Sequence, residues 1–196
     1  MSNVKPTLKP SNIVEFIGDI FARRGGEEYL GEPVTMAEHM LQGASIAEQN
    51  NKSDAVIAAV LLHDIGHFIG EFGTFTMGDT QDRYHEISGA QMLAPFFPPE
   101  VTASVYHHVA AKRYLCATKA AYFKRLSPAS VHSLNLQGGP MNELEVAEFA
   151  QNPYLEEILQ VRYLDEAGKK ADMQTPTFAH FAPLLQRLVD RHCLHK

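Results

Sequence analysis

The chain has 196 residues, of which 45% are hydrophobic and 20% charged, a composition typical of a folded globular protein rather than a disordered one. Its 17 Lys and Arg against 23 Asp and Glu give a formal charge of −6, which excludes a sequence-independent grip on nucleic acid. Two cysteines without a Cys-x-x-Cys motif exclude a disulfide scaffold and a thiolate zinc site.

The chain reads as one unit, since it contains no repeat, no low-complexity tract and no linker long enough to divide it. We therefore expect a single domain over residues 1–196. The longest apolar run, 55–62, is less than half of the roughly 20 residues that a membrane helix needs. Because the first residues also lack the apolar core of a signal peptide, we expect a soluble cytoplasmic protein with no membrane partner.

Capping signals predict a series of helices. In chain order, they begin after Ser11, at Thr35-x-x-Glu38, at Ser53 or Asp54, at Asp82, at Pro98-Pro99, at Ser127-Pro128, at Asn142-x-x-Glu145, at Asn152-Pro153 and after Thr175-Pro176. The last of them covers about 177–192. Apolar residues recur at helical spacing, and no segment shows sustained period-two alternation, so the predicted fold is all-α.

Several polar side chains fall on the predicted buried faces of these helices. His39 lies on the interior side of its helix. His108 and Lys112 share one helix face with two valines, and Arg162 and Asp165 share another with two apolar residues. One inward histidine is usually a hydrogen-bonded core residue, but the whole set is harder to explain in that way.

The inward His and Asp residues together predict a metal site. They are His39, His63, Asp64, His85, His108 and Asp165. Burying so many polar groups without a cation is costly, and nitrogen and carboxylate ligands without thiolates suit iron, manganese or other divalent ions. Asp64 can bridge two metals while its neighbour His63 binds one, and Gly66 would let the backbone pass close to the site.

The pattern His39, His63-Asp64 and Asp165 resembles the signature of the HD-domain metalloproteins. His85 and His108 resemble the additional ligands of the members that hold two metals. The resemblance implies a single-domain HD helical bundle with a buried dinuclear metal site.

Three further segments, 29–32, 108–115 and 137–141, resemble the mixed-valent diiron oxygenases of phosphonate catabolism. The similarity runs from about residue 29 to 170, which we take as the domain core. It implies two iron ions, Fe(II)/Fe(III), that use O2 to cleave the carbon–phosphorus bond of a small-molecule 1-hydroxyphosphonate. The products would be phosphate and a carboxylate, and a separate upstream phosphonate hydroxylase would install the 1-hydroxyl group.

The same resemblance implies a ligand set. One iron would be held by His39, His63, Asp64 and Asp165, and the other by Asp64, His85 and His108.

The resemblance also implies the residues that act on the substrate. Tyr29 would occupy an iron coordination position in the resting enzyme and swing away with Glu32 when substrate arrives, a turn that Gly31 permits. Lys112 would pair with the phosphonate. The hydrogen-bonding candidates at that end are His67, Ser130, Gln137 and Arg162. Simpler readings stay open, because Lys112 could be a solvated lysine, Tyr29 a packed aromatic residue, and Arg162 a structural partner of Asp165 or Glu166.

The residues that would bind the other end of the substrate depend on which group is attached to its C2 atom. The glycine-rich stretch 70–82 is the most plausible mobile lid. A trimethylammonium group needs aromatic faces with nearby carboxylates. Residues that could provide them are Phe72, Phe75, Asp79, Asp82 and Tyr84, together with Tyr29 and Glu32. We therefore expect the trimethylammonium substrate, which gives glycine betaine, and the primary-amine analogue, which gives glycine, stays open.

Three other functions compete with this one. An HD-domain phosphohydrolase acting on a nucleotide or another phosphate ester would use a metal-bound hydroxide and no O2. A related oxygenase acting on a cyclic polyol would not need Lys112 beside a dianion. A noncatalytic metal-binding module would have no need of open coordination positions.

Overall fold

The structure is a computed structural model, and it describes residues 7–29, 31–69 and 80–194. The helices in chain order are α1 (Ile13–Arg24), α2 (Met36–Gln49), α3 (Asp54–Leu62), the 3-10 helix η1 (Ile65–Phe68), α4 (His85–Leu93), α5 (Pro99–Thr118), α6 (Ala120–Phe123), α7 (Pro128–Leu136), α8 (Glu143–Phe149), α9 (Leu155–Ala167) and α10 (Phe178–Leu194). The described part of the chain contains one isolated β-bridge, Glu28 to Thr35, and no longer strand. The all-α prediction is therefore confirmed.

Most helices begin at the predicted caps. The Thr35 hydroxyl accepts a hydrogen bond from the Glu38 N–H while the Glu38 carboxylate accepts one from the Thr35 N–H, which closes the capping box of α2. Ser53 and Ser127 cap α3 and α7 through their hydroxyls, and Asn142 closes a second capping box at α8. Each cap satisfies backbone N–H groups that have no partner within the helix.

Three predicted caps are wrong. The residue before α1 is Asn12 and not Ser11, and its side chain accepts a hydrogen bond from the Lys9 N–H instead of capping the helix. The helix that carries His85 begins after Tyr84 and not after Asp82.

The third is at α9, which begins after Tyr154 and not at Asn152-Pro153. The Asn152 side chain accepts a hydrogen bond from the Tyr154 N–H at 2.9 Å. In each of these places a short polar side chain serves a turn outside the helix, a role for which Asn and Asp are equally suited.

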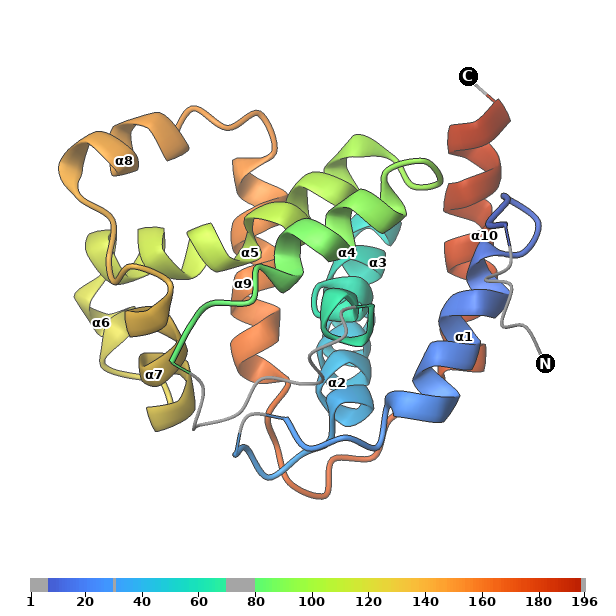
Figure 1. The fold of residues 1–196 in the computed structure, drawn as a ribbon, viewed down its shortest axis with the longest axis horizontal. Helices are drawn as coiled ribbons and strands as arrows, with labels where there is room; N and C mark the ends of the chain where they lie inside the picture. The colour runs from blue at the N-terminus through green and yellow to red at the C-terminus, as the bar shows by residue number, and fades with distance from the viewer. Residues whose placement is uncertain (1–6, 30, 70–79, 195–196) are drawn as a thin grey trace.

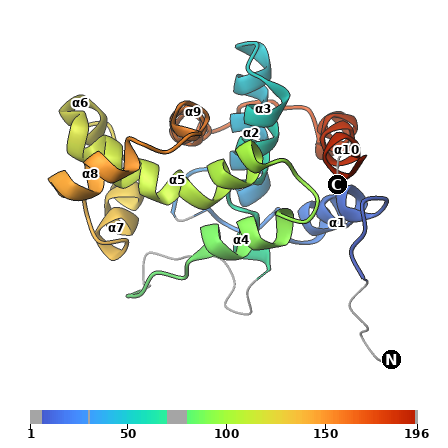
Figure 2. The same ribbon diagram turned by 90° about the horizontal axis from the view of Figure 1, so that it is seen from above.

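The core surrounds α3, which contacts α2, α5, α9 and α10. Every residue from Val56 to Leu62 is buried, as expected for a helix that is apolar nearly all round. Figures 1 and 2 show α1 and α10 at one end of the molecule and α6, α7 and α8 at the other, with α2, α3 and α4 between them. The middle of the bundle is therefore where elements from distant parts of the sequence meet.

Gly66 in η1 allows two elements to approach closely. A Cβ added at Gly66 would lie 1.8 Å from the carbonyl oxygen of His85, at the start of α4. Only a residue without a side chain fits there. The prediction that Gly66 brings the backbone near the site is confirmed, and the contact places His85 beside the end of α3.

No helix among the described residues combines the length and the apolar character that spanning a membrane requires.

Candidate metal centre

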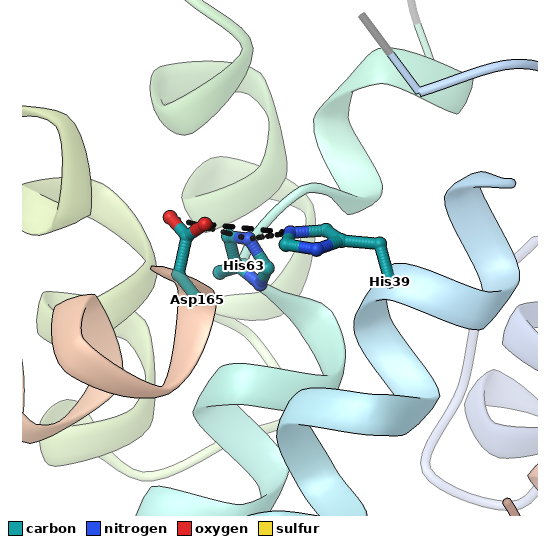
Figure 3. A group of neighbouring side chains, drawn as sticks. All are labelled: His39, His63 and Asp165. Carbon is teal, nitrogen blue, oxygen red and sulfur yellow. Dashed lines mark hydrogen bonds and ion pairs between the residues drawn. The ribbon is translucent and has the colours of Figure 1, made fainter. Parts of the chain in front are cut away.

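The first cluster of candidate ligands joins three helices. His39 comes from α2, His63 follows the last residue of α3, and Asp165 lies on α9, and all three are buried. The two Nε2 atoms are 3.1 Å apart, and the Asp165 carboxylate oxygens lie 3.5 Å from His39 Nε2 and 3.6 Å from His63 Nε2. Figure 3 shows the three side chains pointing toward one another, so that they could hold one metal ion.

The second cluster lies beside the first. His85 at the start of α4 and His108 in α5 bring their Nε2 atoms to 3.0 Å from each other. Both rings face Asp64 Oδ1, at 3.1 Å and 3.4 Å. His67 stacks on His85 with ring centroids 3.9 Å apart, and its Nε2 is 3.9 Å from the same oxygen. This cluster therefore contains one more imidazole than the sequence predicts as a ligand.

Asp64 connects the two clusters. Its Oδ2 faces the first, at 3.3 Å from His63 Nε2 and 3.7 Å from His39 Nε2. Its Oδ1 faces His85 and His108. One carboxylate with an oxygen directed to each cluster is the arrangement that a bridging ligand requires.

The hydrogen bonds of the ring nitrogens fit metal binding. The Nδ1 atoms of His39, His63 and His108 donate to the carbonyls of Gly168, Val60 and Val105, at 2.9, 2.7 and 2.7 Å. A carbonyl only accepts, so each neutral ring carries its proton on Nδ1 and presents a lone pair at Nε2. Lone pairs that face each other at about 3 Å repel unless a proton or a cation lies between them. Nitrogen and carboxylate donors without thiolate suit iron or a similar ion.

The protonation states in this centre also favour a cation. Burial lowers the pKa of His39 and of His108 to about 4, so both rings are neutral at pH 7. Burial alone would raise the pKa of Asp64, but His63 and the hydrogen bonds from neighbouring rings hold it well below its usual range. Burial lowers the pKa of His63, but Asp64 and Asp165 outweigh burial and raise this pKa to about 9. A proton on His63 thus supplies positive charge where a metal ion would otherwise supply it.

A narrow cavity of about 40 Å³ opens beside the clusters. Five of the predicted substrate-binding residues line it: Tyr29, His67, Lys112, Gln137 and Arg162. Lys112 is only 4% exposed, so the interpretation that it is a solvated lysine is wrong. Its Nζ donates to Ser133 Oγ at 2.7 Å, and burial lowers its pKa to about 7. The buried Gln137 Oε1 has no hydrogen-bond partner in the described part of the chain, so a donor in the cavity would satisfy it.

Tyr29 stacks on a candidate ligand. Its ring lies 3.9 Å from the ring of His39, at an interplanar angle of 14°. The Glu32 N–H donates to the Tyr29 carbonyl at 2.7 Å, and Gly31 has φ 70, the left-handed conformation that such a turn favours in glycine. Burial and the nearby Asp64 raise the pKa of the Tyr29 phenol well above its usual value. Tyr29 is thus next to the first cluster and neutral.

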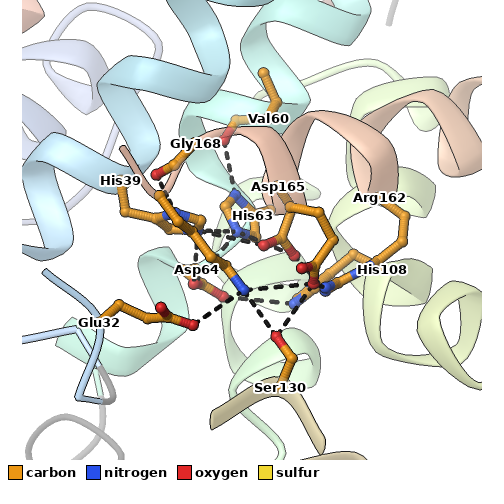
Figure 4. A network of polar contacts seen from close by, with 12 residues as sticks. Glu32, His39, Val60, His63, Asp64, His108, Ser130, Arg162, Asp165 and Gly168 are labelled. Atoms are coloured by element: carbon orange, nitrogen blue, oxygen red, sulfur yellow. Dashed lines mark hydrogen bonds and ion pairs between the residues drawn. The ribbon is translucent and has the colours of Figure 1, made fainter. Parts of the chain in front are cut away.

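Glu32 and Ser130 belong to a polar network next to the cavity, shown in Figure 4. The network centres on Lys169, whose Nζ lies 2.8 Å from Ser130 Oγ, 3.4 Å from Glu166 Oε1 and 3.6 Å from Glu32 Oε1. The Ser127 hydroxyl donates to the same Glu32 oxygen at 2.5 Å. Lys169 was not among the predicted site residues, and because it lies just past the end of α9, helical spacing gave no signal for it.

Each of the three guanidinium nitrogens of Arg162 has a partner. Its Nε donates to Tyr122 Oη at 2.7 Å, and its two terminal nitrogens pair with Asp165 and Glu166. Although burial would lower it, Asp165 raises the pKa of Arg162 above its usual range. These contacts agree with the structural reading of Arg162, which orients Asp165 while it also lines the cavity.

Part of the predicted cation pocket can be placed. Asp82 lines the cavity, whereas Tyr84 is 59% exposed. Phe72, Phe75 and Asp79, with most of the predicted lid, lie outside the described residues.

Fold and site together define a helical metalloprotein in which one aspartate connects two buried His/Asp clusters. The family model for the HD domain matches residues 36–158. A [1-hydroxy-2-(trimethylamino)ethyl]phosphonate dioxygenase (glycine-betaine-forming) from Leisingera caerulea is 68% identical over 185 residues, 94% of each chain. A hydroxymethylphosphonate dioxygenase from Gimesia maris is 42% identical over 160 residues, 80% of this chain and 78% of the relative. The chain belongs to the HD-domain family, in the group that contains these phosphonate dioxygenases.

Proposed function

We propose that this protein is an oxygenase that cleaves the carbon–phosphorus bond of 1-hydroxy-2-(trimethylammonio)ethylphosphonate. O2 and the substrate would give glycine betaine, hydrogen phosphate and one proton, so that C1 is oxidised to the carboxylate and O2 is reduced. The observation that carries the proposal is the 68% identity to the Leisingera caerulea enzyme over 94% of the chain. The arrangement of two ligand clusters around Asp64 agrees with it.

The proposed cofactor is a pair of iron ions, Fe(II)/Fe(III). His39, His63 and Asp165 would hold one iron, His85 and His108 the other, and Asp64 would bridge them. Bound iron would supply the one-electron chemistry with O2 that amino-acid side chains lack. Backbone carbonyls fix the tautomer of three of the four candidate histidine ligands, so that Nε2 of each of these rings is directed toward the metal position.

Lys112 and its neighbours would bind the phosphonate. A buried ammonium next to a hydroxyl and an unpaired amide oxygen suits an anion that also carries a hydroxyl group. His67 and Arg162 border the same cavity and could donate further hydrogen bonds. These contacts would orient C1 toward the metal centre.

Tyr29 and Glu32 would move when the substrate binds. A cavity of about 40 Å³ holds a few water molecules and is too small for the whole substrate. The turn at Gly31 carries both residues, and it is joined to the helices through Lys169 and Ser127. Ser130, which now contacts Lys169, would become available to the phosphonate when this network opens.

The direct test is phosphate release by the iron-loaded protein. The trimethylammonium substrate and its primary-amine analogue are supplied separately, with and without O2. We expect phosphate release that requires O2 and is faster with the trimethylammonium compound. In the cell, a separate phosphonate hydroxylase would supply this substrate. No release from either compound, together with hydrolysis of phosphate esters without O2, would instead identify a phosphohydrolase.

A further inference from the structure

The proposed substrate carries a permanent positive charge at C2, which a protein recognises with carboxylates and aromatic faces. Outside the two metal clusters, four described carboxylates lie around the centre: Glu32, Asp82, Glu86 and Glu166. Their present partners differ, and this difference indicates which of them are available to a cation.

Glu32 and Glu166 already contact cations. Lys169 Nζ lies 3.6 Å from Glu32 and 3.4 Å from Glu166, and Arg162 also pairs with Glu166. The Ser127 hydroxyl also donates a hydrogen bond to the Glu32 carboxylate. An additional cation would have to displace these groups.

Asp82 and Glu86 have no such partner, since no lysine or arginine within the described ranges forms an ion pair with either. Asp82 accepts a hydrogen bond from the Tyr84 N–H at 3.2 Å and lines the cavity. Glu86 is 8% exposed, and its buried Oε2 makes no hydrogen bond to any described residue. His85 Nδ1 lies 3.5 Å from that oxygen.

The two carboxylates lie close to each other. The ligand atoms of Asp82, His85 and Glu86 are all within 4.8 Å of one another. Two negative charges at this distance repel. A bound cation would relieve that repulsion.

We propose that Asp82, supported by Glu86, receives the trimethylammonium group of the substrate, in a cation subsite beside His85 that rests on the proposed function. The nitrogen is separated from the 1-hydroxyl group by only two carbon atoms, so a substrate whose hydroxyl is at the metal centre has its cation close to that centre, of which His85 is part. Tyr29 lines the same cavity, but it stacks on His39 in the first cluster and would move when the substrate binds. The subsite therefore rests on its two carboxylates, which attract a quaternary ammonium group by charge.

Binding without turnover tests this subsite. Titration calorimetry on the iron-loaded protein in the absence of O2 compares the trimethylammonium substrate with hydroxymethylphosphonate, which has no cation. We expect Asp82→Asn to weaken binding of the trimethylammonium compound by about tenfold, or about 1.4 kcal/mol, and to leave hydroxymethylphosphonate unaffected. Glu86→Gln should act in the same direction. Glu148→Gln, which removes an exposed charge on α8, is the matched control and should change neither affinity.

The results separate the possible outcomes. Unchanged binding of the trimethylammonium compound, or an equal loss for both phosphonates, would overturn the subsite. Loss of iron from the Asp82→Asn protein would also overturn it, because Asp82 would then be a metal ligand. If the selective loss occurs but no O2-dependent phosphate release is found, the subsite stands and the proposed reaction is wrong.

Discussion

At the level of single residues, the centre depends most on Asp64. It faces both clusters, whereas each histidine faces one. Its carboxylate is buried, and the rings around it keep it ionised. A ligand shared in this way should affect both metals when it is removed.

We therefore expect Asp64→Ala to lose both irons and His108→Ala to lose mainly one. The half-exposed neighbour His107 provides the control, and His107→Ala should retain both. Iron per chain, measured by elemental analysis after desalting, gives the answer. Two full equivalents in the Asp64→Ala protein would contradict the bridging role.

Lys112 should act on substrate and not on metal. Removing a charged hydrogen-bond donor from a buried site costs about 1.5–3 kcal/mol of binding, so Lys112→Ala should raise KM by about 10- to 100-fold. Its iron content should equal that of the unmodified protein. Loss of iron would indicate a structural function for Lys112 instead.

The pKa of Lys112 also predicts a pH dependence. Burial and the Arg162 guanidinium lower this pKa to about 7, so the ammonium form that attracts a dianion predominates below pH 7 and is lost above it. We expect kcat/KM to fall as the pH rises through about 7. Lys112→Ala should remove this decrease, and an unchanged profile in that variant would assign it to another group.

At the level of elements, the approach of η1 to α4 determines where His85 lies. A methyl group at Gly66 would collide with the backbone oxygen of His85, which is not free to move like a side chain. The two elements must separate, and His85 must move away from Asp64.

Gly66→Ala should therefore destabilise the protein by about 1–3 kcal/mol. It should also weaken iron binding at the cluster of His85 and His108 more than at the cluster of His39, His63 and Asp165. Urea unfolding and iron analysis measure the two effects. Gly26 is the matched control, because nothing lies within 4 Å of a Cβ added there. Equal stability of both alanine variants would contradict the close approach.

At the level of the whole molecule, the metals should contribute to stability, since their candidate ligands come from α2, α4, α5, α9 and the end of α3. Binding only to the folded state adds about 4 kcal/mol when free metal is a thousandfold above its dissociation constant. We expect a chelator to lower Tm markedly, and readdition of iron to restore it. The Asp64→Ala protein should show little change, and a large chelator effect in that variant would argue against this origin.

Much of the fold follows from helix-capping patterns that can be recognised in the sequence. The capping boxes at Thr35 and Asn142 and the serine caps at Ser53 and Ser127 were predicted, because their hydrogen bonds join residues three apart. The caps at Ser11, Asp82 and Asn152 were wrong, since Asn and Asp serve turns as readily as helix ends. The four-residue α6 was too short to show a periodicity.

The site divides in the same way between sequence and tertiary structure. Residue type and helical spacing identified the inward His and Asp residues, because burial of one helix face repeats along the chain. The two faces of Asp64, the stacking of His67 on His85 and the position of Lys169 between Glu32 and Glu166 depend on how helices cross. The helices and the kinds of ligand therefore follow from local sequence patterns. Which carboxylates already have cations depends on the packing of the helices, because those partners come from distant segments.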